Sequence, residues 1–401
     1  MRAFIVLAFL GALASFGYGF WLVLSPEGHN WHVDIPLDRD IDRPSDRNRD
    51  GGTSADVGVP ANPPAETTSD ASPQEAPQVA PQVAPTAAPI ALGLPIDCKP
   101  GVDCWIVNYV DVDPSDKRRD YRCGQMSYDG HKGTDIGLAN EALIETDVPV
   151  LAAVAGRVIG TRDGEPDAGA AGIEAAKAAG RECGNGVRIE HGDGWVTQYC
   201  HLREGSLRVQ AGQEVAAGQA LGAVGLSGMT EFPHVHLSLS RDGQVVDPFR
   251  GVAGGPECGL GTQPLWDGPT LAALAAQRAP VLLDAAFFDG VPEADSAAAG
   301  TAARTELAPD AEAIVLWFRA AGVEPGDTGR VTITAPDGTV VIDETATFDR
   351  HQASVYRAFG LRNSPRRFPD GLPSGDWRGR VETQRDGRTT GERSIFVRVD
   401  G

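Results

Sequence analysis

Short apolar runs recur between about residue 94 and residue 264, and turns rich in Gly or Asp separate them. Several runs alternate apolar and polar residues, as in Val187-Arg188-Ile189-Glu190, which is the period of a half-buried antiparallel strand. The segment His-Gly-Asp-Gly-Trp at 191–195 predicts a hairpin turn. The pattern predicts strands at 104–110, 148–159, 186–191, 195–201, 215–224 and 234–240.

An Ala-rich stretch at 161–182 separates two of these strands and predicts a partly helical insertion that walls a cleft. A second series of short, turn-bounded runs begins near residue 280, with a flexible loop expected at 291–310. Short strands spaced in this way predict a β-sandwich, so the expected fold class is all-β. The runs of the second series lie at 281–288, 313–321, 329–334, 340–348 and 394–399.

The N-terminal residues 4–24 carry no charge and are almost all apolar, and Arg2 precedes them. This run is long enough to cross a bilayer as a helix and longer than the apolar region of most signal peptides. We therefore favour an uncleaved membrane anchor, with a cleaved signal peptide as the alternative. In both cases the positive end stays in the cytoplasm and the remainder is exported, which predicts a periplasmic or other extracytoplasmic location.

Two segments of biased composition follow the apolar run. Residues 34–56 alternate Asp and Arg, and residues 59–92 are rich in Pro, Ala, Thr and Gln. Neither segment can bury a core, so we expect a solvated, extended spacer. The predicted organisation is a signal anchor or signal peptide at 1–25, a disordered linker at 26–93, a first domain at 94–264, a connector at 265–279 and a second domain at 280–401.

The chain of 401 residues is acidic, with 35 Lys and Arg against 55 Asp and Glu and a formal net charge of −20. A nucleic-acid binder needs a basic surface, so no nucleic-acid partner is expected. Hydrophobic residues make up 41% of the chain, which is enough for real cores and excludes wholesale disorder.

The cysteine count is even, and an even count in an exported chain predicts disulfide bonds. The close spacing of Cys98 and Cys104 makes them the easiest pair to expect, whereas the sequence leaves the full connectivity open. A cysteine-rich metal site is disfavoured because the chain contains no CxxC motif. The six candidates are Cys98, Cys104, Cys123, Cys183, Cys200 and Cys258.

Five of the eight histidines lie between residues 131 and 236. On a strand, His234 and His236 project to the same face, because side chains alternate with a period of two. His131 and Asp135 can add a second imidazole and a carboxylate, and two histidines with one carboxylate form a common catalytic zinc set. His201 ends a predicted strand and suits a role as general base or in stabilising an intermediate.

Five segments stand in the order and spacing of a known enzyme family: GHKGTDIGL at 130–138, VLAAVAGRV at 150–158, GNGVRIEHGDGWVTQYCHL at 184–202, VQAGQEVAAGQALGAVG at 209–225 and FPHVHLSL at 232–239. The stretch that they cover, 130–247, resembles the lysostaphin-like, LytM-type zinc metallopeptidases, which cut peptidoglycan cross-bridges. The resemblance implies a compact antiparallel β fold with a cleft over a sheet.

The resemblance also implies roles for single residues. His131, Asp135 and His236 match the family's ligands of one Zn²⁺ per chain. His234 and His201 match its two catalytic histidines, the first helping to deprotonate water and the second stabilising the tetrahedral intermediate, although these two roles can be exchanged.

Several positions add to this picture or depart from it. Asn185 matches a family Asn near the metal, and His191 falls where the family has no ligand, so a structural role is expected for it. Tyr128 and Arg122, just before the first motif, are candidates for binding a carboxylate or steadying an oxyanion. Glu231-Phe232 replaces the Ser/Thr-Gly pair that the family often has, which puts the substrate preference in doubt.

The expected function is that of a zinc-dependent endopeptidase that hydrolyses peptide cross-links of peptidoglycan in the cell envelope. The alternatives are a non-catalytic regulator of cell-wall amidases, a zinc protease acting on Gly-rich protein, and an adhesive protein. The second domain resembles an immunoglobulin-like module at the level of fold only. We expect it to dock to an envelope protein or to the wall, or to gate the cleft.

Overall fold

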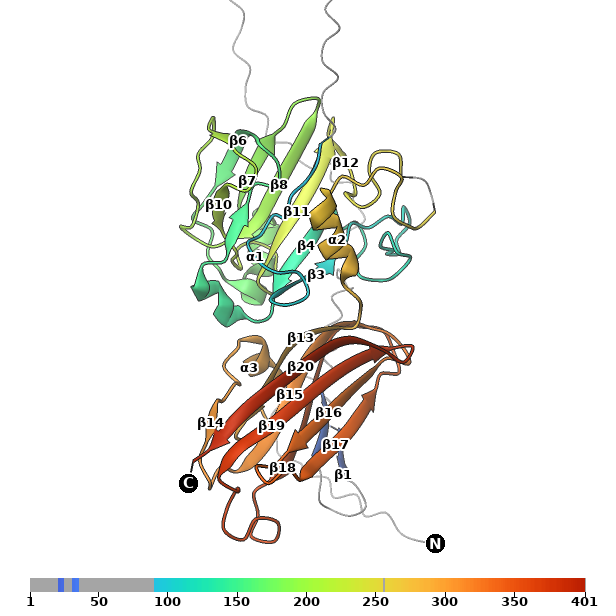
Figure 1. The fold of residues 1–401 in the computed structure, drawn as a ribbon. Helices are drawn as coiled ribbons and strands as arrows, with labels where there is room; N and C mark the ends of the chain where they lie inside the picture. The colour runs from blue at the N-terminus through green and yellow to red at the C-terminus, as the bar shows by residue number, and fades with distance from the viewer. Residues whose placement is uncertain (1–20, 25–30, 36–89, 255–256, 401) are drawn as a thin grey trace, which may run out of the picture.

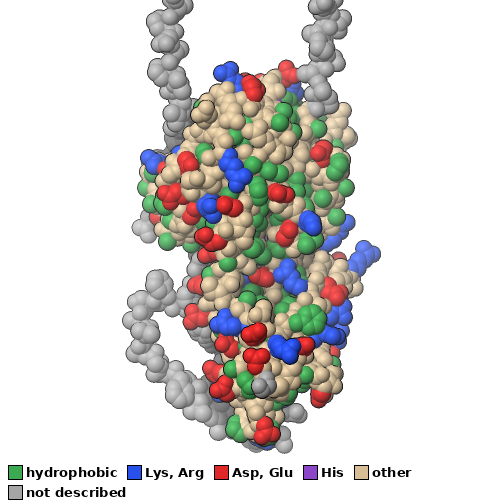
Figure 2. Space-filling model, turned by 60° about the vertical axis from the view of Figure 1, so that its left-hand side comes forward, with side chains coloured by type: hydrophobic (Ala, Val, Ile, Leu, Met, Phe, Trp, Pro, Cys, Tyr) green, Lys and Arg blue, Asp and Glu red, His purple; other side chains and the backbone are tan. Residues whose placement is uncertain are grey.

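The computed structural model describes residues 21–24, 31–35, 90–254 and 257–400. This part of the chain is mostly β, with few helices, and its strands form several largely antiparallel sheets. Figure 1 shows two β-rich units, one above the other, with helix α2 at their junction. In the face shown in Figure 2, acidic and basic side chains are interspersed over both units.

The first unit is built on an eight-stranded sheet with the strand order β3-β4-β11-β8-β7-β6-β9, in which β12 also pairs with β11. A separate two-stranded sheet joins β5 (Pro149–Leu151) to β10 (Ala220–Ala223). The strands of the large sheet are β3 (Cys104–Asn108), β4 (Gly133–Leu138), β6 (Gly156–Arg162), β7 (Asn185–Glu190), β8 (Trp195–Leu202), β9 (Glu214–Val215), β11 (His234–Arg241) and β12 (Gln244–Val245).

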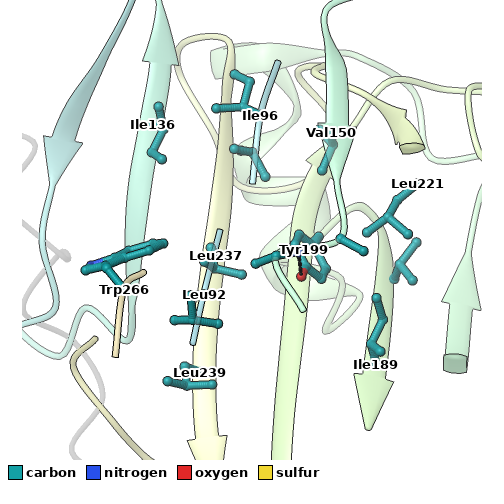
Figure 3. Close-up of a cluster of buried hydrophobic side chains, with 14 of the residues drawn as sticks. Leu92, Ile96, Ile136, Val150, Ile189, Tyr199, Leu221, Leu237, Leu239 and Trp266 are labelled. Atoms are coloured by element: carbon teal, nitrogen blue, oxygen red, sulfur yellow. Dashed lines mark hydrogen bonds between the residues drawn. The ribbon is translucent and has the colours of Figure 1, made fainter. Parts of the chain in front are cut away.

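One face of the large sheet packs into an apolar core. Ile136, Leu237 and Tyr199 come from three adjacent strands and lie against Val150 and Leu221 of the small sheet (Figure 3). The Tyr199 hydroxyl accepts a hydrogen bond from the Ala153 amide at 2.8 Å, so this buried polar group is satisfied. Because strand side chains alternate, the neighbouring residues of β4 and β11 point to the opposite face of the sheet.

The predicted strands of this unit are found with adjusted ends. The run at 148–159 contains β5 and part of β6, and the run at 215–224 contains β10 and the second residue of β9. The insertion is partly helical as expected, with a 3-10 helix η2 (Gly169–Gly172) and α1 (Ile173–Ala178) between β6 and β7. The alternation pattern did not mark β4, because its six residues, GTDIGL, are all buried and two of them are glycine.

The second unit contains two five-stranded sheets, in the orders β1-β2-β18-β15-β13 and β14-β20-β19-β16-β17. Phe359 from the first sheet and Trp377 from the second lie in the same core between them. Its strands are β1 (Trp21–Leu24), β2 (Trp31–Ile35), β13 (Val281–Phe288), β14 (Glu306–Leu307), β15 (Ala313–Val323), β16 (Thr328–Thr334), β17 (Val340–Thr347), β18 (Gln352–Arg362), β19 (Gly375–Arg385) and β20 (Arg388–Val399).

The expectation of a flexible loop at 291–310 was wrong. This segment holds α3 (Ala294–Ala298) and β14, and it is fixed by packing. Ala297 and Ala302 are fully buried with Trp317, whose indole N–H donates to the Ala302 carbonyl at 2.6 Å. The many small residues of this segment led to the prediction of a loop. In the structure, their small size lets the segment pack closely against β15.

The predicted anchor at 4–24 lies outside the described residues except for its last four, which form β1. Most of the predicted linker also lies outside them. Among the described residues, no helix is both long and apolar enough to cross a bilayer.

Three disulfide bonds join the six cysteines: Cys98–Cys104, Cys123–Cys258 and Cys183–Cys200. The first confirms the pair expected from close spacing, and the other two span 135 and 17 residues. All six candidates are therefore paired, so the cysteine sulfurs are committed to structure rather than to a metal.

The two units meet through a small apolar contact and several polar ones. Trp105 and Ala139 of the first unit pack with Val281, Leu283 and Ala321 of the second. Trp105 lies opposite Gly137 in the register of β3 and β4, so it shares the face that bears Asp135. The second unit therefore borders the same face of the large sheet as the metal-binding candidates.

Hydrogen bonds extend the apolar contact between the two units. The Gln277 side chain, just after α2 (Gly268–Ala276), accepts from the Ile106 amide and donates to the Ile106 carbonyl, both at 2.8 Å. Asn140 donates to Asp284 at 2.8 Å, and Arg319 donates to the Ala139 carbonyl at 3.0 Å. These contacts hold the end of β4 against the second unit.

We predict that Leu283→Asp uncouples the two units. The substitution loses at least the roughly 2 kcal/mol of a large-to-small core change and also buries a charge. Differential scanning calorimetry should show the second unit melting separately and at a lower temperature. Val340→Asp is the matched control because Val340 is 55% exposed, and identical melting of the two variants would contradict the prediction.

The buried carboxyl of Asp247 should make the free energy of unfolding depend on pH. Its carboxyl is 8% exposed, and its Oδ2 has no hydrogen-bond partner among the described residues. Burial raises its pKa from 3.8 to about 6, so the folded protein binds this proton more tightly than the unfolded chain does. The stabilisation is therefore complete below pH 4 and is lost as the pH rises through 6.

Asp247→Asn removes this dependence. Between pH 4 and pH 7 the unfolding free energy of the variant, relative to the parent, should rise by about 3 kcal/mol. Urea unfolding at the two pH values measures the difference. Asp310→Asn, at an exposed position, should leave the pH dependence of the parent unchanged, and a flat difference for Asp247→Asn would refute the assignment.

Candidate active site

The register of two neighbouring strands, β4 and β11, brings the metal-binding candidates together. In the pairing of β4 with β11, Asp135 lies opposite His236 and Gly137 lies opposite His234. His131 precedes β4 by two residues, and its ring lies 5.0 Å from that of His236. Residues about 100 positions apart thus form one site on the face of the sheet away from the core.

The donor atoms of this set are spaced as ligands of one ion. His131 Nε2 lies 3.1 Å from Asp135 Oδ2 and 3.2 Å from His236 Nδ1, and that Nδ1 lies 2.8 Å from Asp135 Oδ1. Nitrogen and oxygen ligands at about 2.0–2.1 Å from a tetrahedral zinc ion are separated by similar distances.

The position of the proton on the neutral His131 ring explains why the site needs a cation. A carbonyl oxygen can only accept, so His131 Nδ1–H donates to the Tyr109 carbonyl at 2.7 Å. In the neutral ring, Nε2 then presents a lone pair towards a carboxylate and a second imidazole nitrogen. Three electron-pair donors aimed at one point repel each other unless a cation lies between them, so the residues fit zinc.

The charge of Asp135 fits the same role. The carboxylate is 2% exposed, and burial alone opposes its ionisation. The three imidazoles around it, those of His131, His234 and His236, nevertheless hold its pKa well below the usual value. Asn108 also donates to Asp135 Oδ2 at 3.0 Å. Asp135 therefore enters the site as an anion.

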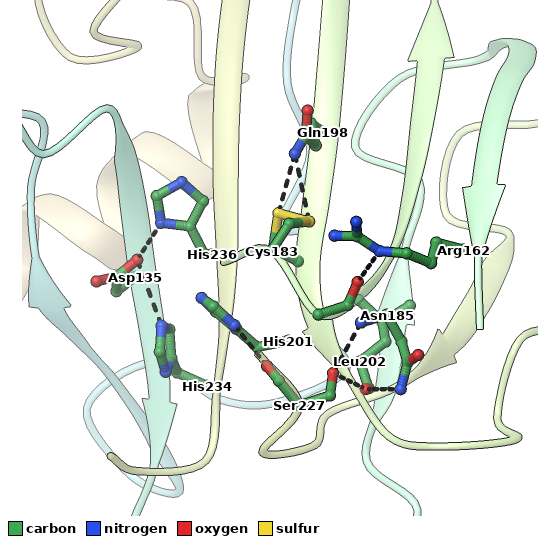
Figure 4. Close-up of a disulfide and its surroundings, with 12 residues drawn as sticks. Asp135, Arg162, Cys183, Asn185, Gln198, His201, Leu202, Ser227, His234 and His236 are labelled. Carbon is green, nitrogen blue, oxygen red and sulfur yellow. Dashed lines mark hydrogen bonds and ion pairs between the residues drawn. A yellow bond between two sulfur atoms is a disulfide. The ribbon is translucent and has the colours of Figure 1, made fainter. Parts of the chain in front are cut away.

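Two further imidazoles lie beside this set. Figure 4 shows the Asp135 carboxylate between His236 and His234, with His201 alongside them. The rings of His201 and His234 lie 4.7 Å apart, and those of His201 and His236 lie 6.0 Å apart. The structure thus brings together all five residues that were predicted as ligands or catalytic groups.

Both additional imidazoles are held as proton acceptors. His234 Nδ1 donates to the Phe232 carbonyl at 2.9 Å, and His201 Nδ1 donates to the Ser227 carbonyl at 2.8 Å. Burial lowers the pKa of His234 and lowers that of His201 further, well below 6.5. Each neutral ring therefore keeps a lone pair on Nε2.

The residues that support these rings were not marked by the sequence pattern. Tyr109 and Ser227 act through backbone carbonyls, which any residue supplies, so no sequence signal identifies them. Thr230 lies 3.1 Å from His234 Nδ1 through its hydroxyl. The Phe232 ring stacks on His234 at 4.5 Å, so the Glu231-Phe232 departure does border the site.

The comparison with protein families agrees with this geometry. Residues 129–248 match Peptidase family M23. The first unit is therefore similar to the peptidases of this family. The matched stretch contains all five residues of the site.

Curated relatives match over shorter stretches. Cell division protein DipM of Caulobacter vibrioides is 39% identical over 69 residues, 17% of this chain and 11% of that protein. Peptidoglycan DD-endopeptidase ShyA of Vibrio cholerae is 37% identical over 67 residues, 17% of this chain and 15% of that protein. The chain thus spans less than a sixth of the length of these relatives.

A solved structure also aligns with the chain. It is a mutant catalytic domain of the prophage-encoded M23 protein EnpA from Enterococcus faecalis, with 24% sequence identity. The alignment covers 37% of this chain and 88% of that one, with a TM-score of 0.25.

The other predicted residues of the first unit lie in different surroundings. Tyr128 is near the metal set, with its ring 4.4 Å from that of His131, and burial followed by the Asp135 charge raises its pKa. The phenol is therefore protonated at neutral pH and can donate a hydrogen bond. His191 bonds to the Ala155 carbonyl and to Thr197, both at 2.8 Å, which is a structural arrangement.

Arg122 and Asn185 make their contacts elsewhere. Arg122 donates to the Gln277 and Ala275 carbonyls at the end of α2, so the structure does not bring it to the metal set. Asn185 is fully buried and bonds to the Glu165 backbone and the Leu202 carbonyl. It ties the insertion to β8 instead of touching a ligand.

Gly133 leaves the space that His236 occupies. A Cβ at this position would lie 2.5 Å from His236 Cε1 and 2.8 Å from the Leu237 carbonyl oxygen. We predict that Gly133→Ala displaces the imidazole and weakens zinc binding by roughly 10–100-fold, the range typical of a disturbed ligand orientation. Competition with a chelating dye measures the affinity.

Gly160→Ala is the control for this substitution, because a Cβ there meets no atom within 4 Å. It should keep the zinc affinity and the circular dichroism of the parent. Equal zinc affinity for Gly133→Ala and Gly160→Ala would mean that the His236 ring, as placed here, is not a ligand.

Proposed function

We propose that the chain is a zinc-dependent endopeptidase that hydrolyses peptide cross-links of peptidoglycan outside the cytoplasmic membrane. The observation that carries this proposal is the convergence of a complete donor set with two further buried imidazoles. The M23 match supports the class of reaction, and the name of ShyA supports the substrate. By the same likeness we propose a DD cross-link as the bond that is cut.

The metal would be held by His131, Asp135 and His236, one ion per chain. A zinc ion bound there supplies Lewis-acid chemistry, because it polarises a carbonyl oxygen and makes water acidic near neutral pH. Asp135 contributes one negative charge and the histidines contribute neutral nitrogens. With a divalent ion held there, the site would keep a net positive charge.

The proton is moved by the two neutral imidazoles. His234 Nε2 accepts the proton of the attacking water, since its Nδ1–H is already committed to the Phe232 carbonyl. His201 faces the same point from β8, and its Nε2 lone pair can stabilise the tetrahedral intermediate by accepting a hydrogen bond from a hydroxyl of that intermediate. Both rings arrive as acceptors, so the two roles can be exchanged.

Tyr128 is proposed to orient the substrate. Its raised pKa keeps the phenol protonated beside His131, where it can donate to the carbonyl oxygen under attack. The Phe232 ring, stacked on His234, is proposed to border the adjoining substrate position.

We also propose the division of labour along the chain. Residues 94–264 carry catalysis, and residues 280–401 form an immunoglobulin-like domain that borders the cleft or docks to an envelope protein. The apolar residues 4–20 would anchor the chain in the cytoplasmic membrane, and residues 36–89, which follow β2, would serve as a spacer towards the wall.

Digestion of purified peptidoglycan by the full chain tests this function, with products identified by mass spectrometry. We expect new peptide termini, lost with chelator and restored by zinc. His131→Ala and His236→Ala should lose both zinc and activity. His201→Ala and His234→Ala should retain zinc and lose at least about 100-fold in rate, the order of a general acid–base contribution.

His191→Gln is the control, since His191 bonds to Ala155 and Thr197 away from the metal set. It should retain both zinc and activity. A zinc-loaded parent that releases no peptide from peptidoglycan, but cleaves a Gly-rich polypeptide or activates an amidase, would overturn the proposal.

A further inference from the structure

We propose that the Cys183–Cys200 disulfide is a positioning element of the catalytic centre that fixes the backbone of His201 and so aims its imidazole. This inference rests on the proposed function for its effect on rate, whereas its effect on the His201 backbone is independent of it. The bond lies beside the imidazoles in Figure 4, and the sequence had left its pairing open.

His201 needs such a device because its backbone departs from the strand. On β8, Tyr199 faces the core, so a regular alternation would turn His201 to the core as well. Its φ of 62° lies in the left-handed region, which costs a non-glycine residue about 1–2 kcal/mol. The register shifts here, because β8 uses one more residue than β7 between their paired positions.

Regular alternation turns Cys200 towards the metal-binding face, and the bulge turns His201 to that face as well. Cys200 lies directly opposite His236 in the pairing of β8 with β11. The His201 ring reaches to within 4.7 Å of His234. The catalytic orientation of His201 is therefore produced by an irregular backbone, which must be held by neighbours.

Cys183 holds this backbone in two ways. Its carbonyl accepts the His201 amide at 2.9 Å, and its sulfur is bonded to the residue just before His201. A covalent bond and a hydrogen bond thus join the same two short segments. Gln198 adds its side-chain amide, which lies 3.3 Å from Cys183 Sγ and 3.2 Å from Cys200 Sγ.

The segment around Cys183 also holds the loop that receives the His201 imidazole. The Glu182 carbonyl accepts the Met229 amide at 2.8 Å, and the Asn185 amide donates to the Ser227 hydroxyl at 2.9 Å. The Ser227 carbonyl accepts His201 Nδ1–H. The disulfide therefore fixes His201 directly and supports the partner of its ring.

The bond is placed where a reductant can reach it. Cys183 is half-buried, although Cys200 is only 3% exposed, and the neighbouring Arg181 and Glu182 are exposed. A dithiol can attack the Cys183 sulfur, break the S–S bond, leave two thiols and itself become a cyclic disulfide, with two electrons and two protons transferred. A disulfide oxidant such as oxidised glutathione restores the bond, because it accepts the two electrons and two protons and becomes two thiols.

The test compares Cys183→Ser/Cys200→Ser with Cys98→Ser/Cys104→Ser. The second variant removes a disulfide from the start of β3, away from the histidines. We expect the first to lower kcat by roughly 10–100-fold, as a misplaced catalytic group does, with KM within about twofold and zinc still at one per chain. The second should lower the melting temperature and leave kcat unchanged.

Hydrogen–deuterium exchange gives a readout independent of catalysis. In Cys183→Ser/Cys200→Ser, the His201 amide should exchange at least about tenfold faster than in the parent, because its acceptor segment is no longer tied down. The amides of β11 should exchange as in the parent. If the parent cuts no peptidoglycan, the proposed function fails while this measurement still decides the role of the disulfide.

A third experiment keeps the proposal testable if the Cys183→Ser/Cys200→Ser variant does not fold. The Cys98→Ser/Cys104→Ser/Cys123→Ser/Cys258→Ser chain, in which Cys183–Cys200 is the disulfide that remains, is treated with dithiothreitol in excess zinc and then reoxidised with oxidised glutathione. Loss and recovery of kcat and of His201 protection support the proposal. Unchanged kcat and exchange on reduction, or equal loss of kcat in both double variants, would overturn it and leave the disulfide a general stabiliser.

Discussion

The antiparallel register of β4, β11 and β8 places Asp135, His236 and Cys200 side by side in one row of the sheet. Every other feature of the site is arranged around this row. A shift of one residue in β11 would send both of its histidines to the core face. The register is held by the apolar residues of the opposite face, such as Ile136 and Leu237, so the core and the metal set depend on the same hydrogen-bonded ladder.

The site is built from groups that cannot satisfy each other without a cation and a substrate. Asp135 and four imidazoles converge within a few ångströms. The outer nitrogens of His131, His234 and His201 are committed to the carbonyls of Tyr109, Phe232 and Ser227, respectively. These carbonyls decide which nitrogen carries the proton and hence which atoms face the reaction. The backbone thus sets the chemistry of the side chains.

Irregular backbone is concentrated where the reaction is proposed. His201 is left-handed and lies at a bulge, and a disulfide and a buried loop surround it. The second unit is bonded to the end of β4 through Asp284 and Arg319, so it borders the same face. Rigid connections on both sides of the site fit a reaction that requires several groups to be aligned at once.

The sequence by itself determined much of this arrangement. The spacing of His234 and His236 puts both on one face of a strand, and alternation located most strands of the first unit. The short separation of Cys98 and Cys104 gave their pairing. These are local properties, which follow from the pitch of a strand or the reach of a short loop.

Only the tertiary structure decided the rest. Asp135 and His236 meet across 101 residues because β4 pairs with β11, and β4 itself has no alternating pattern. The side chain of His201 faces the metal-binding side because of a bulge, whereas regular alternation would place it in the core. Contacts between distant segments also decide that Cys183 pairs with Cys200 and that Arg122 binds at the end of α2, away from the metal set. A local sequence pattern does not encode such contacts.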